Sequence, residues 1–349
     1  MAVGDNVTTG FLSYLAVGRE ITYGSYNTCT AGLNFLSASL KMTKETKILE
    51  EIQTSRTNSN FIQLGRVLEG EIEAYFSPMN LACNYILQNA FGGGTVVSAT
   101  ATGDTVGSGT FQHTVSINNF LTTYSSLCLN HRKGDSSVGK IFEYSGIRVN
   151  EFSLNAEIDE ALMMNVGVIG KDGSVTANNV ASVLDASTQR PLSFVNGRLS
   201  VESSTALLTS TSFWNVQTMN FTVSNNLNSD TSARRIGSDT LQVLPAGLAQ
   251  FELKATVRFD TTTAYDAMMS GTRFAAEFFF QGDTMSGSTL RESIKLTFPA
   301  VYISDAGDPE VGGPNDPLTS EVTFAVLRDP TTSGYAVQAT VINKTNSYA

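Results

Sequence analysis

The sequence is poor in charge and in the residues that most often carry chemistry. Charged residues make up 15% of the 349-residue chain, against roughly 25% in a typical soluble domain. There are two histidines, His113 and His131, and a single tryptophan. Neither histidine has another histidine or a cysteine at metal-ligand spacing. We therefore expect structural or surface roles for both histidines, and neither a metal nor a cofactor.

Motifs of nucleophilic and nucleotide-binding sites are also missing. There is no nucleophile elbow, P-loop or dinucleotide fingerprint, and "FGGGT" at 91–95 follows a predicted helix, the wrong context for phosphate binding. Glu69 and Glu71 would lie about 7 Å apart on a strand, a spacing that glycosidases use. No sugar-stacking aromatic residues are interleaved with them, so we predict that the protein is not an enzyme.

Long apolar runs are absent and cysteines are few. No stretch approaches the roughly 18 apolar residues of a membrane helix, and no secretion signal is recognisable. Cys29, Cys83 and Cys128 are widely spaced among apolar neighbours, which predicts buried, reduced thiols. These features favour synthesis in a cytoplasm and no membrane partner.

Basic residues are fewer than acidic ones, 22 against 32, for a net charge of −10. This balance argues against a sequence-independent grip on nucleic-acid phosphates. The remaining surface must be rich in Ser, Thr, Asn and Gly, which suits extended strands and self-contact.

Alternating apolar and polar residues dominate the chain and predict a mainly antiparallel β protein. The clearest segments are 149–159, 219–224, 249–259, 294–303 and 321–327. Two short helices are expected: one with Ser77 as N-cap, Pro78 in its first turn and Gly92 after its end, the other between Asp260 and Gly271.

An internal repeat is indicated by the order of these segments. A shift of 183 positions aligns 68–76 with 251–259 and the first helix with the second. We therefore predict two tandem modules, each a β-sandwich or half-barrel with one short flanking helix. The first module with its N-terminal arm covers residues 1–171, a connector with a strand in 191–201 covers 172–212, and the second module covers 213–349.

The stretch "LEGEIEAYF" at 68–76 places Glu69, Glu71 and Glu73 side by side on one strand face. Like charges so placed repel each other and cost stability, which suggests a use for a negative surface. The aligned positions of the second module keep a single carboxylate, Glu252, and also carry Lys254 and Arg258. Two interpretations stay open: the faces line a channel, or they are ordinary solvated sheet. Further lining candidates on polar strand faces are Glu157, Asp159, Asn155, Asn220, Thr222 and Ser224.

Several segments resemble the tail tube proteins of long-tailed bacteriophages. They are "AVGREITYGSYNT", "GRVLEGEIEAYFSPMNLACNYILQNAFGG", "YSGIRVNEFSLNAEIDE" and the C-terminal "LTFPAVYIS" with "LTSEVTFAVLRD". The resemblance implies a structural virion protein that self-assembles into stacked rings. These rings form a hollow tube through which viral DNA is ejected into the host.

The resemblance carries further expectations. Most members contribute one module to a hexameric ring, so a fused pair implies a homotrimer with pseudo-sixfold symmetry. Expected partners are other copies of the chain, a tape-measure protein, a tail terminator, baseplate or distal tail proteins, and DNA in transit without specific binding. The expected location is the virion tail, after assembly in the bacterial cytoplasm. An acidic bore would repel the duplex and let it slide.

Stacking of rings requires contacts along the tube. Two polar stretches, 41–60 and 225–242, carry mixed charge and are predicted to reach the adjacent ring; the alternative is that they are mobile surface loops. Their charged candidates are Lys44, Glu45, Lys47, Glu50, Glu51, Arg56, Asp230, Arg234, Arg235 and Asp239.

Two rival functions remain at this point. One is another self-assembling ring, such as a type VI secretion tube or a baseplate protein, although such tube subunits are normally shorter single modules. The other is a carbohydrate-binding β-sandwich of a tail fibre, which would expose several aromatic residues near acids.

Overall fold

The computed structural model describes residues 10–52, 54, 56–92, 97–100, 109–117, 126–134, 140–180, 190–208, 213–259, 262–307, 309, 317–329, 334–346 and 348. The protein is mainly β, as predicted, and all pairings between its described strands are antiparallel. The strands are β1 (Tyr14–Glu20), β2 (Ala31–Leu33), β3 (Ser37–Ala38), β4 (Lys41–Ile48), β5 (Phe61–Tyr75), β6 (Val97–Thr100), β7 (Phe111–Ser116), β8 (Ser126–Lys133), β9 (Lys140–Glu157), β10 (Met163–Gly170), β11 (Asp172–Thr176), β12 (Gly197–Glu202), β13 (Val216–Ser224), β14 (Gln250–Arg258), β15 (Arg273–Thr284), β16 (Arg291–Ala306), β17 (Thr319–Val326) and β18 (Gln338–Asn343). The α-helices are α1 (Leu81–Ala90) and α2 (Thr263–Ser270), and short 3-10 helices cover Gly10–Leu12, Phe194–Asn196, Thr205–Leu207 and Thr231–Ala233.

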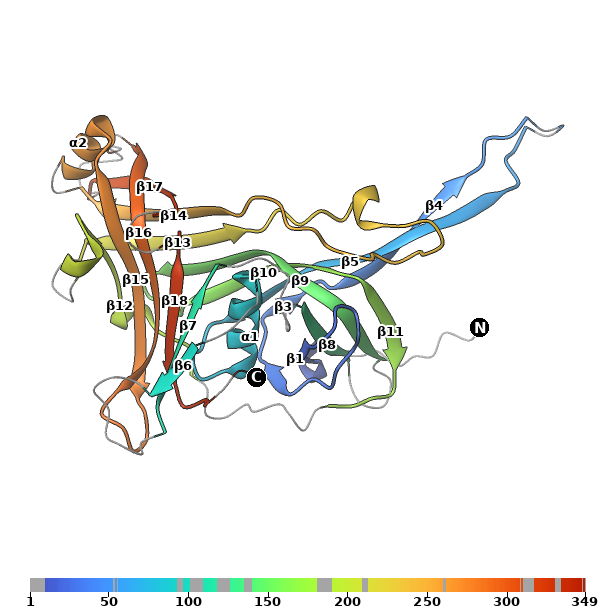
Figure 1. Ribbon diagram of the computed structural model, residues 1–349, viewed down its shortest axis with the longest axis horizontal. Coiled ribbons are helices and arrows are strands. Elements are labelled where there is room, and N and C mark those ends of the chain that lie inside the picture. Colours follow the sequence, from blue (N-terminus) through green and yellow to red (C-terminus); the bar gives the residue numbers. More distant parts are fainter. Residues whose placement is uncertain are drawn as a thin grey trace.

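Six strands form a continuous sheet that crosses both halves of the chain, in the order β5, β10, β9, β13, β14, β17. The halves join where β9 pairs with β13, with Leu154 opposite Phe221. In Figure 1 these strands run along the length of the molecule, while β12, β15, β16 and β18 run across one end. The sheet is thus one surface built from residues far apart in sequence.

The order of pairing is similar in the two halves. In the first, β5 pairs with β10, β10 with β9, β9 with β8 and β8 with β1. In the second, β14 pairs with β17, β17 with β16, β16 with β15 and β15 with β12. A helix follows β5 and another follows β14.

The core lies on one side of the six-stranded sheet. Alternate residues of these strands, such as Ile72, Val166 and Phe324, are buried in one large apolar cluster. Helix α1 is enclosed by this cluster (Figure 1), and its residues from Ala82 to Ala90 are all buried. Strand side chains alternate between faces, and most of the intervening residues on the opposite face are exposed or half-buried.

The helices occur where predicted, but the first cap differs. Asn80, not Ser77, is the N-cap of α1, and its side-chain oxygen accepts hydrogen bonds from the backbone N–H groups of Ala82 and Cys83. Pro78 lies in the turn before the helix rather than in its first turn. Gly271 ends α2 at φ +63, the left-handed conformation that favours glycine. Asp260 lies outside the described residues.

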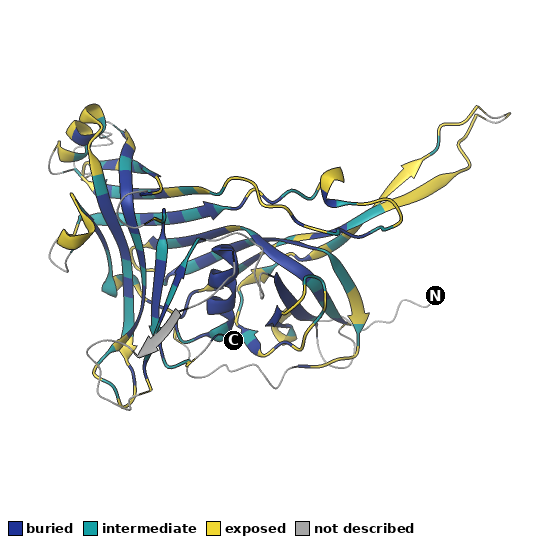
Figure 2. Ribbon diagram, in the orientation of Figure 1, coloured by how far each residue is buried: buried dark blue, intermediate teal, exposed yellow. Residues whose placement is uncertain are grey.

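The largest departure from expectation is the stretch 41–60. It contains strand β4, which pairs with the first half of β5. We call β4, the connecting residues and β5 up to Arg66 the hairpin. It projects from one end of the molecule's long axis and is exposed over most of its length (Figure 2). Strand pairing between hydrogen-bonded backbones, not apolar periodicity, makes this segment regular.

Part of the segment 172–212 also belongs to the sheets. β11 pairs with β9, and β12, which overlaps the stretch 191–201 where a strand was expected, pairs with β15. The three cysteines are free and buried, as predicted. His131 lies in β8 in a buried, structural position, and burial together with nearby Lys133 lowers its pKa to about 4.

Candidate functional site: an acidic sheet face

The open side of the six-stranded sheet carries a concentration of carboxylates, which we call the acidic face. Glu69 and Glu71 on β5 are exposed and Glu73 is partly exposed, while Leu68 and Ile72 between them are buried. The alternation predicted for this stretch is therefore present. The Ser37 hydroxyl donates a hydrogen bond to Glu73 at 3.1 Å, which ties β3 to the same face.

Pairing extends this face across β10 and β9. Glu73 lies opposite Asn165, and Asn165 opposite Ser153; Glu71 lies opposite Gly167, and Gly167 opposite Glu151. Gly167 has no side chain, so Glu71 and Glu151 line one open depression together with their neighbours. Two carboxylates thus share a surface without a cation between them in this row.

The centre of the face is a hydrogen-bonded row of amides and hydroxyls at the joint between the halves. The Asn220 amide donates to the Asn155 side-chain oxygen, and the Thr222 hydroxyl donates to the Asn220 side-chain oxygen at 2.9 Å. Thr218 and Thr256 are bonded at 2.8 Å. These side chains therefore satisfy much of one another's hydrogen-bonding capacity.

The second half of the face has mixed charge. Glu252 forms an ion pair with Lys254, and this contact raises the pKa of Lys254. Glu321 lies opposite Thr256, and Arg258 opposite Thr319. Acidic side chains still outnumber basic ones on the whole face; the acids are Glu69, Glu71, Glu73, Glu151, Glu157, Glu252 and Glu321, and the bases are Lys41, Lys254 and Arg258.

Of the predicted lining residues, Glu157 ends β9 opposite Thr218 and belongs to the face. Asp159 does not lie on a strand: it occupies the turn between β9 and β10 at φ +67. A short polar residue tolerates this left-handed conformation. Its charge is exposed at the end of the sheet rather than in the carboxylate rows.

Three contributors to the face were not singled out from the sequence: Glu151, Glu321 and Lys41. Each lies in a segment whose alternation is visible in the sequence, so its face could be assigned. What the sequence does not give is which strands are neighbours, and only the pairings of β10 with β5 and β9 and of β14 with β17 bring these residues together.

One end of the acidic face is covered by the segment 225–248. Leu227, Ala233, Leu241 and Leu244 from this segment form a small apolar cluster with Val67 and Ile169 of the sheet. The Arg148 guanidinium, buried beside it, donates a hydrogen bond to the Leu244 carbonyl at 2.6 Å. The acidic face is thus bounded at the end from which the hairpin emerges.

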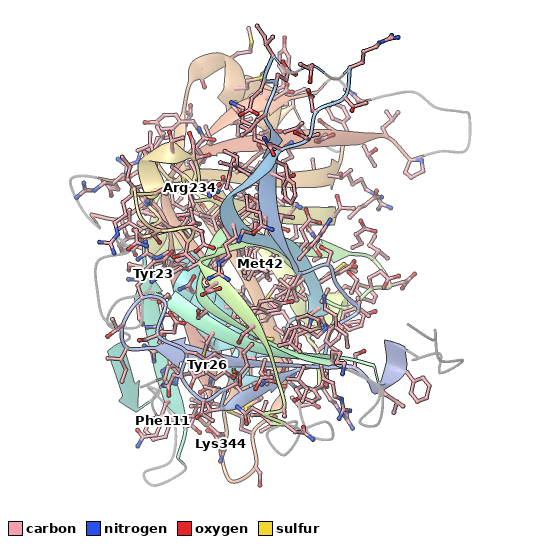
Figure 3. The ribbon with its side chains drawn as sticks, turned by 90° about the vertical axis from the view of Figure 1, so that its right-hand side faces the viewer. Tyr23, Tyr26, Met42, Phe111, Arg234 and Lys344 are labelled. Atoms are coloured by element: carbon pink, nitrogen blue, oxygen red, sulfur yellow. The ribbon has the colours of Figure 1, made fainter. Side chains whose placement is uncertain are left out.

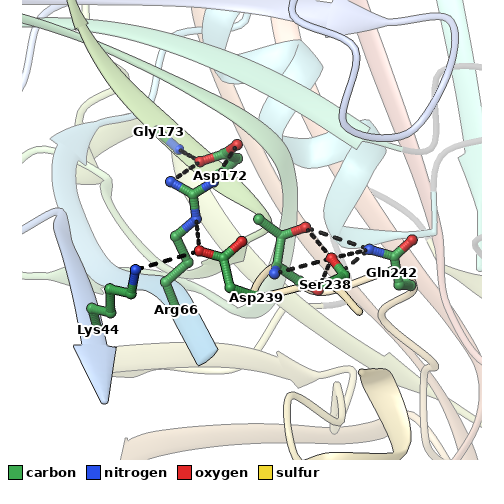
Figure 4. Close-up of polar contacts among 8 residues, drawn as sticks. Lys44, Arg66, Asp172, Gly173, Ser238, Asp239 and Gln242 are labelled. Atoms are coloured by element: carbon green, nitrogen blue, oxygen red, sulfur yellow. Dashed lines mark hydrogen bonds and ion pairs between the residues drawn. The ribbon is translucent and has the colours of Figure 1, made fainter. Parts of the chain in front are cut away.

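The same segment braces the base of the hairpin (Figure 4). Asp239 forms ion pairs with Lys44 at 3.6 Å and with Arg66 at 3.4 Å, and its backbone carbonyl accepts from the Arg66 N–H at 2.7 Å. Arg66 also pairs with Asp172 at 3.2 Å. In Figure 3, seen from the hairpin's side, Arg234 lies beside this base, and it forms an ion pair with Glu45 at 3.6 Å.

The structure therefore brings the two predicted stacking stretches into contact with each other. Lys44, Glu45, Asp239 and Arg234 are engaged within the chain. The remaining candidates are exposed: Lys47 on β4, Glu50, Glu51 and Arg56 at the hairpin's tip, and Asp230 and Arg235 on the bracing segment.

Among the described residues, no three His, Cys, Asp or Glu side chains are placed to share a metal ion. Neither described helix has the length and apolar character that crossing a bilayer requires.

The model of the phage tail tube protein family matches residues 10–326 of this chain. The match covers most of the 349 residues, so the chain belongs to the phage tail tube protein family. This is a structural family of the viral tail. No curated protein matches the chain in sequence.

Proposed function

We propose that copies of this chain assemble into rings, and that the rings stack into the hollow tail tube through which viral DNA is ejected. The acidic face is the wall of the bore. The observation that carries this proposal is the excess of carboxylates on a broad open face whose other side is fully covered by core. Duplex DNA carries about one negative charge per 1.7 Å of its axis, so such a wall repels it along the whole path.

Ring closure in this proposal repeats the joint that exists within the chain. β9 continues beyond its pairing with β8 and there pairs with β13. β16 likewise continues from Ile303 to Ala306 beyond its last pair with β15, and this short edge has no strand partner on that side among the described residues. β3 pairs with β5 in the first half, just as β13 pairs with β14 in the second. In the proposed ring, β3 of the neighbouring copy therefore pairs with the free edge of β16, as β13 pairs with β9 within the chain.

The similar order of pairing in the two halves supports a tandem duplication with modules at 1–171 and 213–349. Two modules per chain would make a ring of three chains with pseudo-sixfold symmetry. In this proposal the tube is assembled in the host cytoplasm, and its further partners are a tape-measure protein, a tail terminator and baseplate or distal tail proteins. A type VI or baseplate ring is the alternative that the same sheet face would also suit.

Electron microscopy of the purified protein tests the proposal. We expect tubes with a central channel and end-on averages with three chains per ring. Six chains per ring would contradict the proposed pair of fused modules but would still agree with a tail tube. A protein that remains monomeric at high concentration, including in the presence of a phage lysate's tail initiators, would contradict the proposed function itself.

A further inference from the structure

The two ends of the long axis carry different exposed apolar surfaces. At one end is the tip of the hairpin, where Phe61 is 63% exposed and Ile48, directly opposite it in register, is 62% exposed. Ile52 is fully exposed beside them. Isolated apolar side chains are common on surfaces, but a projecting cluster of this kind marks an interaction site.

The opposite end of the molecule contains a pocket of about 360 Å³ between the end of β14, the start of α2 and the segment before β13. We call it the end pocket. Aromatic side chains at its wall include Trp214, Phe259, Phe213, which is 56% exposed, and Tyr265, which is 43% exposed. Figure 1 shows α2 and the hairpin's tip at opposite ends of the long axis.

We propose that the end pocket receives the hairpin's tip of another copy of this chain, so that rings are held together by an apolar plug. β5 and β14 run in the same direction because an even number of antiparallel steps separates them. The hairpin extends from the start of β5, and the pocket lies at the end of β14. A copy displaced along the strands therefore presents its tip to the end of the next molecule that holds the pocket, a head-to-tail contact.

Reach and charge agree with this occupant. The stretch Phe61–Val67 spans about 20 Å as a strand, so the tip lies well away from the body of its own molecule. Glu50 and Glu51 are exposed at the tip together with Arg56, and Arg258 is an exposed cation at the wall of the pocket. Burial of the apolar side chains would stabilise the contact, and attraction between the tip carboxylates and Arg258 would favour one orientation of the tip in the pocket.

The end of β5 does not offer the same receptacle. There, Phe76 is fully buried and α1 is enclosed by the core. A hairpin from β5 must therefore reach a pocket beside β14, four strand positions away, which is about 19 Å at ordinary strand spacing. The docking thus implies that each ring is rotated relative to the one below it. This inference rests on the proposed stacking of rings but specifies the contact that makes it.

Cross-linking between introduced cysteines tests the contact. The three natural cysteines are buried, so a protein carrying Ile52→Cys and Tyr265→Cys reacts mainly at the new positions. Assembled tubes, oxidised with a mild disulfide-forming reagent, should give a ladder of covalent multimers longer than one ring. The matched control keeps Ile52→Cys and carries Val175→Cys, an exposed position on β11, and should give no ladder.

A second variant separates docking from folding. Phe61→Asp changes an exposed side chain, so the monomer should unfold at the wild-type temperature while its critical concentration for tube formation rises at least tenfold. Val175→Asp should change neither quantity. If tubes form normally from Phe61→Asp, or if tubes of the cysteine pair give no ladder, the proposed docking is wrong, while the proposed function as a tail tube still stands. Wild-type protein that forms no tubes contradicts the proposed function instead.

Discussion

At the residue scale, the acidic face holds carboxylates that the fold itself does not require. Glu69 and Glu71 are exposed and make no ion pair within the described part of the chain. Buried carboxylates are treated differently: Glu20 accepts hydrogen bonds from Gly24, Ser126 and Gly146. The contrast separates acids that the fold uses from acids whose charge is available for the proposed repulsion of DNA.

Reversal of charge on the acidic face should slow DNA passage. We expect Glu69→Lys with Glu71→Lys to assemble into tubes and to eject DNA several-fold more slowly, with a rate that recovers at higher salt because lysine–phosphate contacts are screened. Ejection is followed by fluorescence of DNA released from virions. The matched variant, Glu202→Lys with Asp283→Lys, makes the same change in net charge away from the face and should eject at the wild-type rate.

Burial of His131 makes stability depend on pH. Its pKa is lowered to about 4, against about 6.5 in an unfolded chain, so the unfolded state binds the proton first. Above pH 6.5 the histidine is neutral in both states and costs the folded state nothing. As the pH falls from 6.5 toward 4, the free energy of unfolding decreases by up to about 3 kcal/mol because only the unfolded state binds the proton. Urea unfolding at pH 7 and pH 4 should show a smaller loss for His131→Leu than for wild type. Phe35→Leu, which changes its aromatic neighbour and keeps the histidine, should retain most of the loss.

The cap of α1 provides a stability prediction at a single residue. Asn80→Ala removes the acceptor of two backbone N–H groups and the donor to the Gly32 carbonyl. We expect a loss of about 1–2 kcal/mol in the free energy of unfolding, measured by denaturant titration. Ser77→Ala, at the cap expected from the sequence, should cost much less, since the Ser77 hydroxyl has no hydrogen-bond partner in the described structure.

At the scale of elements, the hairpin depends on a polar brace rather than on a core. Beyond Met42, which still packs against the core (Figure 3), the hairpin is held mainly by strand pairing and by Asp239 and Arg234 from the segment 225–248. The close approach of Arg234 requires Gly65, where an added Cβ would overlap the guanidinium. We therefore expect the brace to affect the order of the hairpin more than the stability of the whole molecule.

Loss of the brace should loosen the hairpin locally. For Asp239→Ala we expect faster amide hydrogen exchange in β4 and a change of roughly 1 kcal/mol or less in global unfolding, because these ion pairs are partly exposed. Exchange is measured by mass spectrometry of peptides from 41–66. Asp283→Ala, which removes the more exposed pair with Arg190, is the control and should leave β4 unchanged; equal exchange in both variants would show that the brace does not hold the hairpin.

The sequence predicts local features of these elements well and long-range ones poorly. Alternation identified β9, β13, β14, β16 and β17, and it placed Glu69, Glu71 and Glu73 on one face. It did not identify β4, whose charged residues carry no apolar alternation because neither face of the hairpin is covered. Nor could it pair β9 with β13 or bring Asp239 to Arg66, since such contacts depend on the packing of distant segments.

At the scale of the whole molecule, three surfaces are arranged along one direction. The acidic face extends along the sheet, the hairpin projects from one end, and the end pocket lies at the other. A tube wall needs a surface toward its contents and complementary surfaces toward the copies before and after it. In the proposed tube, the six-stranded sheet supplies the inner surface, and the elements at its two ends supply the contacts to the copies before and after it.

A cryo-electron microscopy map of the assembled tail tube, resolved well enough to place side chains, would show directly which surface lines the bore. We expect the inner wall to consist of β5, β10, β9, β13, β14 and β17, with Glu71, Glu151 and Glu252 projecting into the bore. A bore walled mainly by lysine and arginine, or an acidic face buried between subunits or turned to the outside of the tube, would contradict it.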